Sequence, residues 1–536
     1  PWPSAAVHGL LLLLSLASTL LGTAFGEGEF KIPDAAVEAD KNHWYQLGAS
    51  GIDERLRHQV KVGRAKNVVL FLGDGMGIPT VTAARIYKGQ RLSNRSGEES
   101  VLSWDTFPHL SLSRTYGLDV QTSDSANTAT AYLCGVKANF ETLGVDSRIK
   151  SGQCHSDTST HLPSIMQWAQ DAGLWTGIVT TTRVTHATPA ASYSHSGHRN
   201  WEAEVPPDCD AKDIAYQLVH SSPGKGYKVI LGGGRRVFLD KNMKDEEGKP
   251  GQRTDGKNLI KEWTDARKNV RERRPTPGLS RDFSRRRNPQ KTDYLLGLFD
   301  NSHVPYVIER SDNNTTKPTL PEMTKVALDL LSRAPNGFVL LVEGGRIDQA
   351  HHLSMGGSAL EETLEFDQAV SDTYKLLDPE ESLIVVTADH SHTFTMGRLP
   401  DSEAQTSSGL LATRTLISCL SLSSPMAMDQ ASLRTRLIFT NADVAKPDYI
   451  QRSAFKLTEE THGGEEVAVY ATGPWAHLFS GSHDQSYIPH VLAYASCVGR
   501  FAGDKCASPG GGAATPSSLG VVSALMMATM AAVGLR

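Results

Sequence analysis

Six short apolar runs, rich in valine, isoleucine and leucine, set the strongest limit on the fold of this chain. They show no alternation of polar and apolar residues, which is typical of strands buried on both faces of a parallel sheet. The runs span 67–75, 176–182, 227–234, 337–345, 382–390 and 466–473. Helix-like stretches lie between them, at 162–172, 211–220, 320–334 and 358–377. This order predicts an α/β fold: a doubly wound, mainly parallel central sheet with helices on both faces.

Two segments break this order and are expected to be surface insertions or poorly ordered loops. Residues 240–292 carry dense charge and little apolar content, and residues 398–450 are rich in serine and threonine with weak periodicity. The formal net charge of the 536 residues is −5, which gives no sign of a basic surface. Nucleic acid is therefore not expected as a partner.

Both ends of the chain have the composition of targeting signals. The apolar run 10–21 is followed by small residues at Ala24 and Gly26, so residues 1–26 are expected to be a signal peptide. Residues 507–536 begin with small and polar residues and end in an apolar tail, which predicts a glycolipid (GPI) anchor signal. The alternative is a single membrane helix, which is disfavoured because no basic cytoplasmic stop follows the tail. The folded domain is then expected at 27–506.

Six cysteines fit the oxidising compartment that these signals predict. Cys497 and Cys506 would close a short loop and are the first candidates for a disulfide. Cys154 and Cys209 are the next candidate pair, whereas Cys134 lies in an apolar helix-like stretch and is expected to be a buried thiol. Triplets for N-glycosylation occur at Asn94 and at Asn313 or Asn314.

Carboxylate and imidazole groups follow three of the predicted strands. Asp74, Glu343 and the pair Asp389 and His390 each come at the end of an apolar run. In open α/β sheets, functional sites form outside the carboxyl ends of the strands, so we expect these side chains to lie close together. A plain sheet would more often end in glycine, asparagine or serine.

Three further histidines extend this set. Asp348 and His352 are four residues apart and share a helix face, although such a pair alone is more often a surface ion pair. His392 lies two residues after His390, and His462 lies in a glycine-rich turn, where a lone histidine would simply be exposed. Taken together, oxygen and imidazole ligands without thiolates suit catalytic zinc, and an all-oxygen set suits magnesium.

Ser125 stands at the start of a helix-like stretch of small residues, 121–132. The first interpretation is capping, because Asp124 or Ser125 would accept backbone N–H bonds there, and the local pattern alone favours it. The second is a nucleophile facing an anion bound at the helix N-terminus. No G-x-S-x-G elbow or Ser-His-Asp spacing surrounds the serine. A zinc ion beside the hydroxyl could instead lower its pKa, as it does for water.

Seven motifs occur in the order in which the alkaline phosphatase family carries them. They are "FLGDGMG", "DSANTATAYLCGVKAN", "GIVTTTRVTHATPAA", "HRNW", "VEGGRIDQAHH", "TADHSH" and "ETHGGEEVAVYATGP", between residues 67 and 474. The chain resembles this family, specifically its vertebrate secreted and GPI-anchored type, and the wording is most similar to the tissue-nonspecific branch. The family character extends to about Cys506, so the resemblance makes 27–506 the catalytic domain.

The resemblance implies a role for each site residue. Ser125 would be the nucleophile that forms a phosphoserine intermediate, and Arg199 would hold two phosphate oxygens, which suits a planar bidentate donor. His186 would lie near the magnesium and His392 near the zinc pair. The implied metal ligands are Asp348, His352 and His462 for one zinc, Asp74, Asp389 and His390 for the second zinc, and Asp74, Thr188 and Glu343 for magnesium.

The implied activity is hydrolysis of small phosphate monoesters with two Zn²⁺ and one Mg²⁺, at an alkaline optimum because the ligands must be deprotonated. The implied protein is a homodimeric glycoprotein, GPI-anchored on the extracellular face of the plasma membrane. Segments 264–290 and 398–450, the latter at the place of the family's crown, depart from the family pattern. Asp300 and Asp312 are candidate remnants of the family's calcium site, with ordinary acidic surface residues as the simpler interpretation.

Two other functions are alternatives to this one. The first is a related sulfatase or phosphodiesterase: the sulfatase is disfavoured because no Cys/Ser-x-Pro-x-Arg motif surrounds residue 125, and cleavage of diesters stays an open alternative. A catalytically impaired or non-catalytic cell-surface glycoprotein of the same fold would follow if the departures damaged the protein. The intact set of implied ligands argues for the enzyme.

Overall fold

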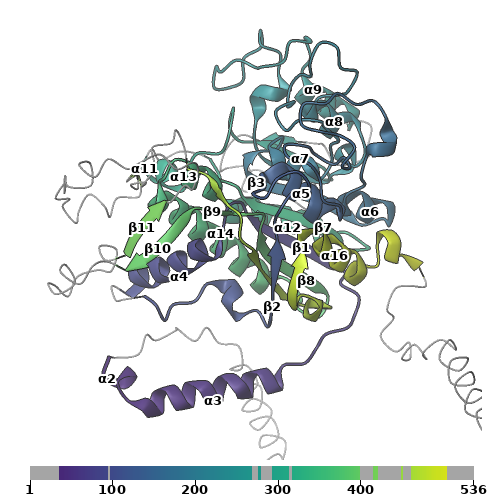
Figure 1. Ribbon diagram of the computed structural model, residues 1–536. Helices are drawn as coiled ribbons and strands as arrows, with labels where there is room; N and C mark the ends of the chain where they lie inside the picture. Colours follow the sequence, from purple (N-terminus) through teal and green to yellow (C-terminus); the bar gives the residue numbers. More distant parts are fainter. Residues whose placement is uncertain are drawn as a thin grey trace, which may run out of the picture.

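A ten-stranded sheet forms the centre of the molecule (Figure 1). The computed structural model describes residues 35–93, 97–267, 276–278, 293–312, 317–398, 415–419, 448, 450 and 460–503. The strand order across the sheet is β14-β2-β13-β8-β1-β7-β3-β4-β6-β5. In chain order the strands are β1 (Asn67–Gly73), β2 (His109–Arg114), β3 (Trp175–Arg183), β4 (Val229–Gly233), β5 (Thr276–Gly278), β6 (Leu295–Leu298), β7 (Phe338–Gly344), β8 (Ser382–Ala388), β13 (Val467–Thr472) and β14 (Gly481–Asp484).

All six apolar runs are strands of this sheet, so the predicted fold class is confirmed. β1 lies at its centre and pairs in parallel with β7 on one side and β8 on the other. The one departure among the six is β13, which pairs antiparallel with both β8 and β2. Its apolar run was expected to be parallel like the others, and that expectation was wrong for this strand.

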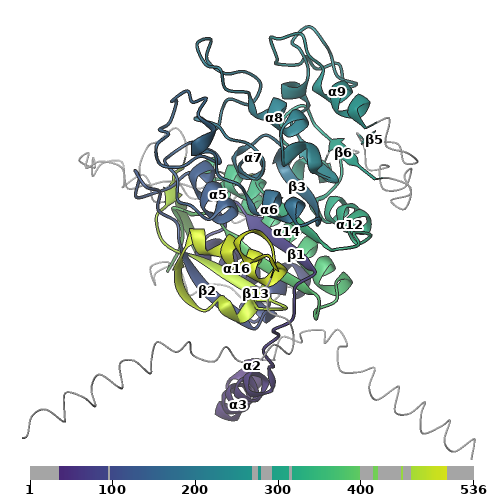
Figure 2. The same ribbon diagram turned by 90° about the vertical axis from the view of Figure 1, so that its right-hand side faces the viewer.

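The sheet is buried on both faces because successive side chains of each strand enter two different cores. Val68 and Leu70 of β1 belong to one core, whereas Val69 and Phe71 belong to the other. Helices α5, α6, α7, α8, α9 and α16 pack on the first face, which is turned toward the viewer in Figure 2. Helices α4, α12, α13 and α14 pack on the second face.

The predicted helices at 162–172, 211–220, 320–334 and 358–377 are present as α6, α8, α12 and α14. α12 begins with a capping box, in which Thr319 and Glu322 bond reciprocally with each other's backbone. The helices are α2 (Ala35–Glu38), α3 (Lys41–Arg57), α4 (Ile78–Ser93), α5 (Ser125–Cys134), α6 (Ile165–Asp171), α7 (Ala187–Ala191), α8 (Ile214–His220), α9 (Leu259–Ala266), α11 (Val307–Asp312), α12 (Leu320–Leu331), α13 (Arg346–His352), α14 (Gly356–Leu376) and α16 (Ile488–Ser496).

Part of the charged segment 240–292 is packed rather than loose. Leu259 and Trp263 of α9 are buried in the first core. The buried Arg253 donates to both carboxylate oxygens of Asp213, at 2.9 and 2.8 Å. Of the two expectations for this segment, a surface insertion or a poorly ordered loop, the packing of residues 240–267 agrees with the first.

Short strands flank the main sheet near the second variable segment. β10 (Phe394–Arg398) pairs antiparallel with β11 (Thr415–Cys419). β9 (Ser391–His392) pairs antiparallel with β12 (His462–Gly463), which brings His392, predicted to lie near the zinc pair, beside the predicted ligand His462. The rest of segment 398–450 lies outside the described residues, apart from two isolated positions.

Helix α3 stands apart from the body of the molecule in both views (Figures 1 and 2). None of its residues is buried, although it carries Trp44, Tyr45, Leu47, Ile52 and Leu56, each more than half exposed. Across the described residues, the helices are either too short or too polar to cross a bilayer. The predicted signal peptide, the anchor signal and the glycosylation positions Asn94, Asn313 and Asn314 lie outside the described residues.

Candidate active site

The hydroxyl of Ser125 is not used as a helix cap. Asp124 caps α5 instead, because its carboxylate accepts hydrogen bonds from two backbone N–H groups of the first turn. The Ser125 Oγ atom lies 3.2 Å from His390 Nε2 and 3.4 Å from Asp74 Oδ1. The serine is buried at the carboxyl edge of the sheet, with its hydroxyl turned toward two of the predicted ligands.

A first cluster gathers around the carboxylate of Asp348. Its Oδ1 atom lies 3.3 Å from His352 Nε2 and 3.4 Å from His462 Nε2. The two histidine Nε2 atoms are 3.1 Å apart. His392 Nε2 lies 2.7 Å from the same carboxylate oxygen, so His392 joins this cluster directly. One ligand atom from each of the four residues falls within 4.8 Å of the others, which is the spacing that a single metal ion requires.

Glu460 supports this cluster and was missed in the sequence. Its carboxylate accepts a hydrogen bond from His392 Nδ1, and its carbonyl accepts one from His352 Nδ1 at 2.7 Å. Burial alone would lower the pKa of His392, but its bonds to Asp348 and Glu460 raise the pKa to about 10. Metal-binding histidines usually donate their second N–H to a carboxylate or carbonyl. A carboxylate two residues before His462 could therefore have indicated the role of Glu460 from the sequence.

A second cluster lies at the ends of β1 and β8. His390 Nε2 is 3.1 Å from Asp389 Oδ2 and 3.6 Å from Asp74 Oδ1. The backbone N–H of Gly75 donates to Asp389 Oδ1 at 2.9 Å, which fixes that carboxylate. Asp74, His390 and Asp348 also lie close enough together to share an ion.

A third cluster joins Asp74 to Glu343 and His186. The hydroxyl groups of Thr180 and Thr182 donate to Glu343 Oε2, which leaves the other oxygen, Oε1, without a hydrogen-bond partner among the described residues. Thr188 is fully buried nearby, and its side chain interacts with Glu343. The structure therefore brings every predicted metal ligand to the same edge of the sheet.

The carboxylates of these clusters suit resident cations. The buried Oδ2 of Asp74 and Oε1 of Glu343 have no hydrogen-bond partner in the described part of the chain. Burial and neighbouring carboxylates raise the pKa of Asp74 well above its ordinary value, and burial raises that of Glu343 to about 7. Uncompensated buried carboxylates are costly, and divalent cations remove that cost. The donor set of carboxylate oxygens and imidazole nitrogens fits zinc and magnesium.

Arg199 lies beside the serine and is held at two points. Its Nη1 donates to Asp124 Oδ2 at 2.9 Å, and its Nη2 lies 3.3 Å from His186 Nε2. The carboxylate that caps the serine helix therefore also orients the arginine, a link between residues 75 apart in sequence that spacing could not reveal.

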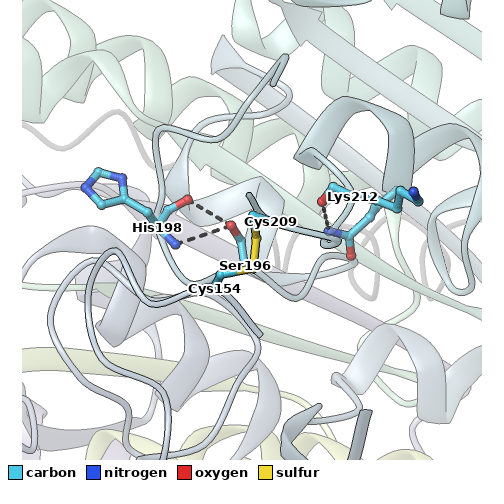
Figure 3. Close-up of a disulfide and its surroundings, with 6 residues drawn as sticks. Cys154, Ser196, His198, Cys209 and Lys212 are labelled. Atoms are coloured by element: carbon cyan, nitrogen blue, oxygen red, sulfur yellow. Dashed lines mark hydrogen bonds between the residues drawn. A yellow bond between two sulfur atoms is a disulfide. The ribbon is translucent and has the colours of Figure 1, made fainter. Parts of the chain in front are cut away.

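The predicted disulfide between Cys154 and Cys209 is present and lies next to Ser196 and His198, in the loop that continues to Arg199 in the sequence (Figure 3). Ser196 and His198 of this loop are hydrogen-bonded to each other at 2.9 and 3.3 Å. Cys497 is also disulfide-bonded, and its predicted partner Cys506 lies outside the described residues. Cys134 is a free buried thiol, as predicted.

The sequence of this chain is similar to those of a known enzyme family. The alkaline phosphatase family matches residues 65–498, which is most of the chain. The chain belongs to the alkaline phosphatase family. This alkaline phosphatase is 43% identical over 510 residues to the tissue-nonspecific isozyme of Gallus gallus, covering 91% of this chain and 96% of the relative. It is 41% identical over 485 residues to the membrane-bound alkaline phosphatase of Bombyx mori, covering 87% of each.

Solved alkaline phosphatases share the fold of this enzyme. The structure from the Antarctic bacterium TAB5 matches with a TM-score of 0.57 at 22% identity, covering 82% of this chain and 100% of that one. The Thermus thermophilus structure matches with a TM-score of 0.58 at 24% identity, covering 81% and 92%. The alkaline phosphatase is thus a phosphoric monoester hydrolase, and its substrates are phosphate monoesters.

The candidate calcium residue Asp300 faces ammonium groups. Its carboxylate lies 3.4 Å from Lys317 Nζ and 3.6 Å from Lys249 Nζ. Lys317 Nζ also donates to the Phe299 carbonyl at 2.6 Å and to the carboxylate of Glu247. Asp312 ends α11, and its side chain lies outside the described part of the structure. In the described residues, the ammonium group of Lys317 supplies the positive charge between the oxygens of Asp300, Phe299 and Glu247.

Proposed function

We propose that this alkaline phosphatase transfers the phosphoryl group of a monoester first to Ser125 and then to water. The observation that carries the proposal is the buried Ser125 hydroxyl, 3.2 Å from His390 Nε2 and 3.4 Å from Asp74 Oδ1. Its position at the N-terminus of α5 also favours an anion, since the first backbone N–H groups and the helix dipole point toward that place.

Three cations would complete this site. Asp348, His352 and His462 would hold one zinc, with His392 beside it. The second zinc would be held by Asp74, Asp389 and His390, and the magnesium by Asp74, Thr188 and Glu343. When bound, these cations would neutralise the phosphate charge and lower the pKa of nearby hydroxyl groups. Calcium is not part of the proposal, because Lys317 already lies between the oxygens near Asp300.

The side chains perform the remaining steps. The Ser125 hydroxyl loses its proton to water and its oxygen attacks phosphorus; the bond between phosphorus and the leaving oxygen breaks, and that oxygen takes a proton from water. Arg199 holds two of the nonbridging oxygens, and Asp124 keeps its guanidinium in place. Water then attacks the phosphoserine, and its P–O bond to Ser125 breaks to release inorganic phosphate. Electrostatic stabilisation of the charge that grows on phosphate oxygens supplies most of the acceleration.

The test is the variant Ser125→Ala, assayed with a chromogenic phosphate monoester at high pH. We expect turnover to fall by at least about a thousandfold, which is the usual scale for removing a nucleophile. Radiolabelled phosphate should be trapped on the wild-type protein after acid quenching, and the label should map to Ser125. Ser123→Ala is the matched control, because Ser123 is equally buried and its hydroxyl makes no hydrogen bond within the described residues. A Ser125→Ala enzyme with near-normal turnover would contradict the proposal.

We also propose that the enzyme is a homodimer on the cell surface, attached through a GPI anchor. The exposed apolar side chains of α3 support the dimer, since an unpartnered apolar helix face of this kind marks an interaction surface. The membrane-bound relative from Bombyx mori supports the location. Light scattering should give twice the chain mass, and a variant with Trp44, Leu47 and Leu56 changed to serine should give a smaller particle. Release from cells by a phospholipase specific for phosphatidylinositol tests the anchor.

A further inference from the structure

Four basic side chains gather at the carboxyl edge of the sheet, on the side away from β8. Arg183 ends β3, and Arg236 lies in the 3-10 turn that follows β4. Arg346 begins α13 after β7, and His303 follows β6. Because β7, β3, β4 and β6 are neighbours in the sheet, these side chains reach the same edge, where the charges of all three arginines act on His303. The carboxyl edge of the sheet thus carries two groups of side chains. Most of the candidate metal ligands follow β8, β1 and β7, and the basic part consists of Arg183, Arg236, Arg346 and His303.

One arginine of the basic part is already fully paired. Arg183 donates to Glu202 through Nε at 2.8 Å and through Nη2 at 2.7 Å. Its Nη1 lies 2.5 Å from His303 Nε2. Glu202 also accepts a hydrogen bond from Thr185, so this carboxylate has no capacity left for a second arginine. Arg183 therefore orients its neighbours rather than binding an anion.

The other two arginines keep unused donors. The Nε atoms of Arg236 and Arg346 are both buried and have no hydrogen-bond partner among the described residues. Arg346 lies over the ring of Tyr306, with its guanidinium carbon 3.5 Å from the ring centroid, and its Nη1 donates to Gln349. A buried N–H without an acceptor is unfavourable, so such donors point to an acceptor that the protein does not itself supply.

The basic part adjoins the phosphate site. The rings of His303 and His186 lie edge to face with centroids 5.4 Å apart, and His186 Nε2 lies 3.3 Å from Arg199 Nη2. Burial lowers the pKa of His303, and the positive charges of Arg183, Arg346 and Arg236 lower it further. The imidazole therefore stays neutral, and the positive charge of the region belongs to the arginines.

We propose that Arg236 and Arg346 form a second anion-binding subsite, which takes a phosphate group carried elsewhere on the substrate molecule. Two imidazole rings separate this subsite from Arg199, so the two phosphates must be several bonds apart. The favoured substrates are then flexible bisphosphates rather than simple monoesters or pyrophosphate. This inference rests on the proposed function, because Arg199 must bind the phosphate that reacts.

The test compares three substrates with the wild-type enzyme: hexyl phosphate, hexanediol bisphosphate and inorganic pyrophosphate. We expect kcat/KM for hexanediol bisphosphate to exceed that for hexyl phosphate by roughly tenfold, the scale of one charge-assisted hydrogen bond. Arg236→Gln should bring the ratio of the two values close to one, and Arg236→Lys should retain part of it. Arg91→Gln is the control for losing one positive charge elsewhere, because Arg91 is half exposed and already paired with Glu361.

Each outcome decides between the proposals. A wild-type ratio near one, or a ratio that Arg236→Gln leaves unchanged, would overturn the subsite. A ratio that falls equally in Arg91→Gln would also overturn it, since general surface charge would then be the cause. Failure of the proposed function would look different, because neither alkyl phosphate would be hydrolysed. Using a ratio within each variant removes differences in the folded fraction.

Discussion

Replacing Lys317 by methionine tests how the structure balances charge near Asp300. The ammonium group is about one-tenth exposed and contacts Glu247, the Phe299 carbonyl at 2.6 Å and Asp300 at 3.4 Å. Methionine keeps most of the stem volume but removes the charge. Breaking a buried ion pair costs about 3–5 kcal/mol, and the partial exposure of Glu247 places the expected loss at about 3 kcal/mol.

Thermal unfolding followed by circular dichroism measures this loss. For a domain of this size, about 3 kcal/mol corresponds to a fall in Tm of roughly 5 °C. Lys325→Met is the matched control, because Lys325 forms an exposed pair with Asp329 and should change Tm by less than about 1 °C. An unchanged Tm in Lys317→Met would refute the claim that this lysine compensates buried oxygens.

The dependence on pH gives a second measurement of the same contact. Burial raises the pKa of Glu247, but the hydrogen bond from Lys317 and the charge of Arg235 outweigh it, so the net pKa lies below the ordinary value of 4.5. A lowered carboxyl pKa stabilises the folded state above the unfolded pKa, and the stabilisation disappears as pH falls through the folded pKa. The Tm difference between wild type and Lys317→Met should therefore shrink below about pH 4, and a constant difference would contradict the assignment.

Three further predictions concern the thiol, the metals and the disulfide. Burial raises the pKa of Cys134 to about 12, so the native thiol should not react with a disulfide reagent at pH 8. It should react fully in denaturant, and rapid labelling of the native protein would contradict the buried position of this thiol. Chelation should abolish phosphatase activity. Without cations the pKa of Glu343 is raised to about 7, so adding back zinc and magnesium near pH 7 should release protons to an indicator as activity returns. Cys154→Ser with Cys209→Ser should lower stability by about 4 kcal/mol and raise KM through the Arg199 loop, whereas an unchanged KM would show that the loop is held without the bridge.

The strands that the sequence revealed are those buried on both faces. β1, β7 and β8 are continuous apolar runs, and nearly every residue of each is buried, whereas their order in the sheet could not be read from these runs. β2 was missed because Ser111 and Ser113 are its buried residues while Leu110 and Leu112 are exposed, the reverse of the usual pattern. The antiparallel direction of β13 was also inaccessible, because an apolar run does not encode the direction of its neighbour.

Some residues of the candidate site could be found from the sequence, and others could not. Asp74, Glu343 and Asp389 could be found because each directly follows a recognisable strand. The pairing of Arg199 with Asp124 could not be found, since it joins a loop to a helix cap across 75 residues. Gln485, whose side-chain amide donates to the Asp389 carbonyl at 2.7 Å, was hidden for the same reason.

Asp74 stands at the end of the central strand and belongs to two of the three candidate metal groups. Its two carboxylate oxygens are part of one rigid group, so an ion that draws on one oxygen alters the charge and orientation of the other. Two cations that share such a ligand are thermodynamically linked, and each must change the affinity of the other by the same factor. The enzyme would then titrate with magnesium along a curve whose midpoint depends on how much zinc it already carries.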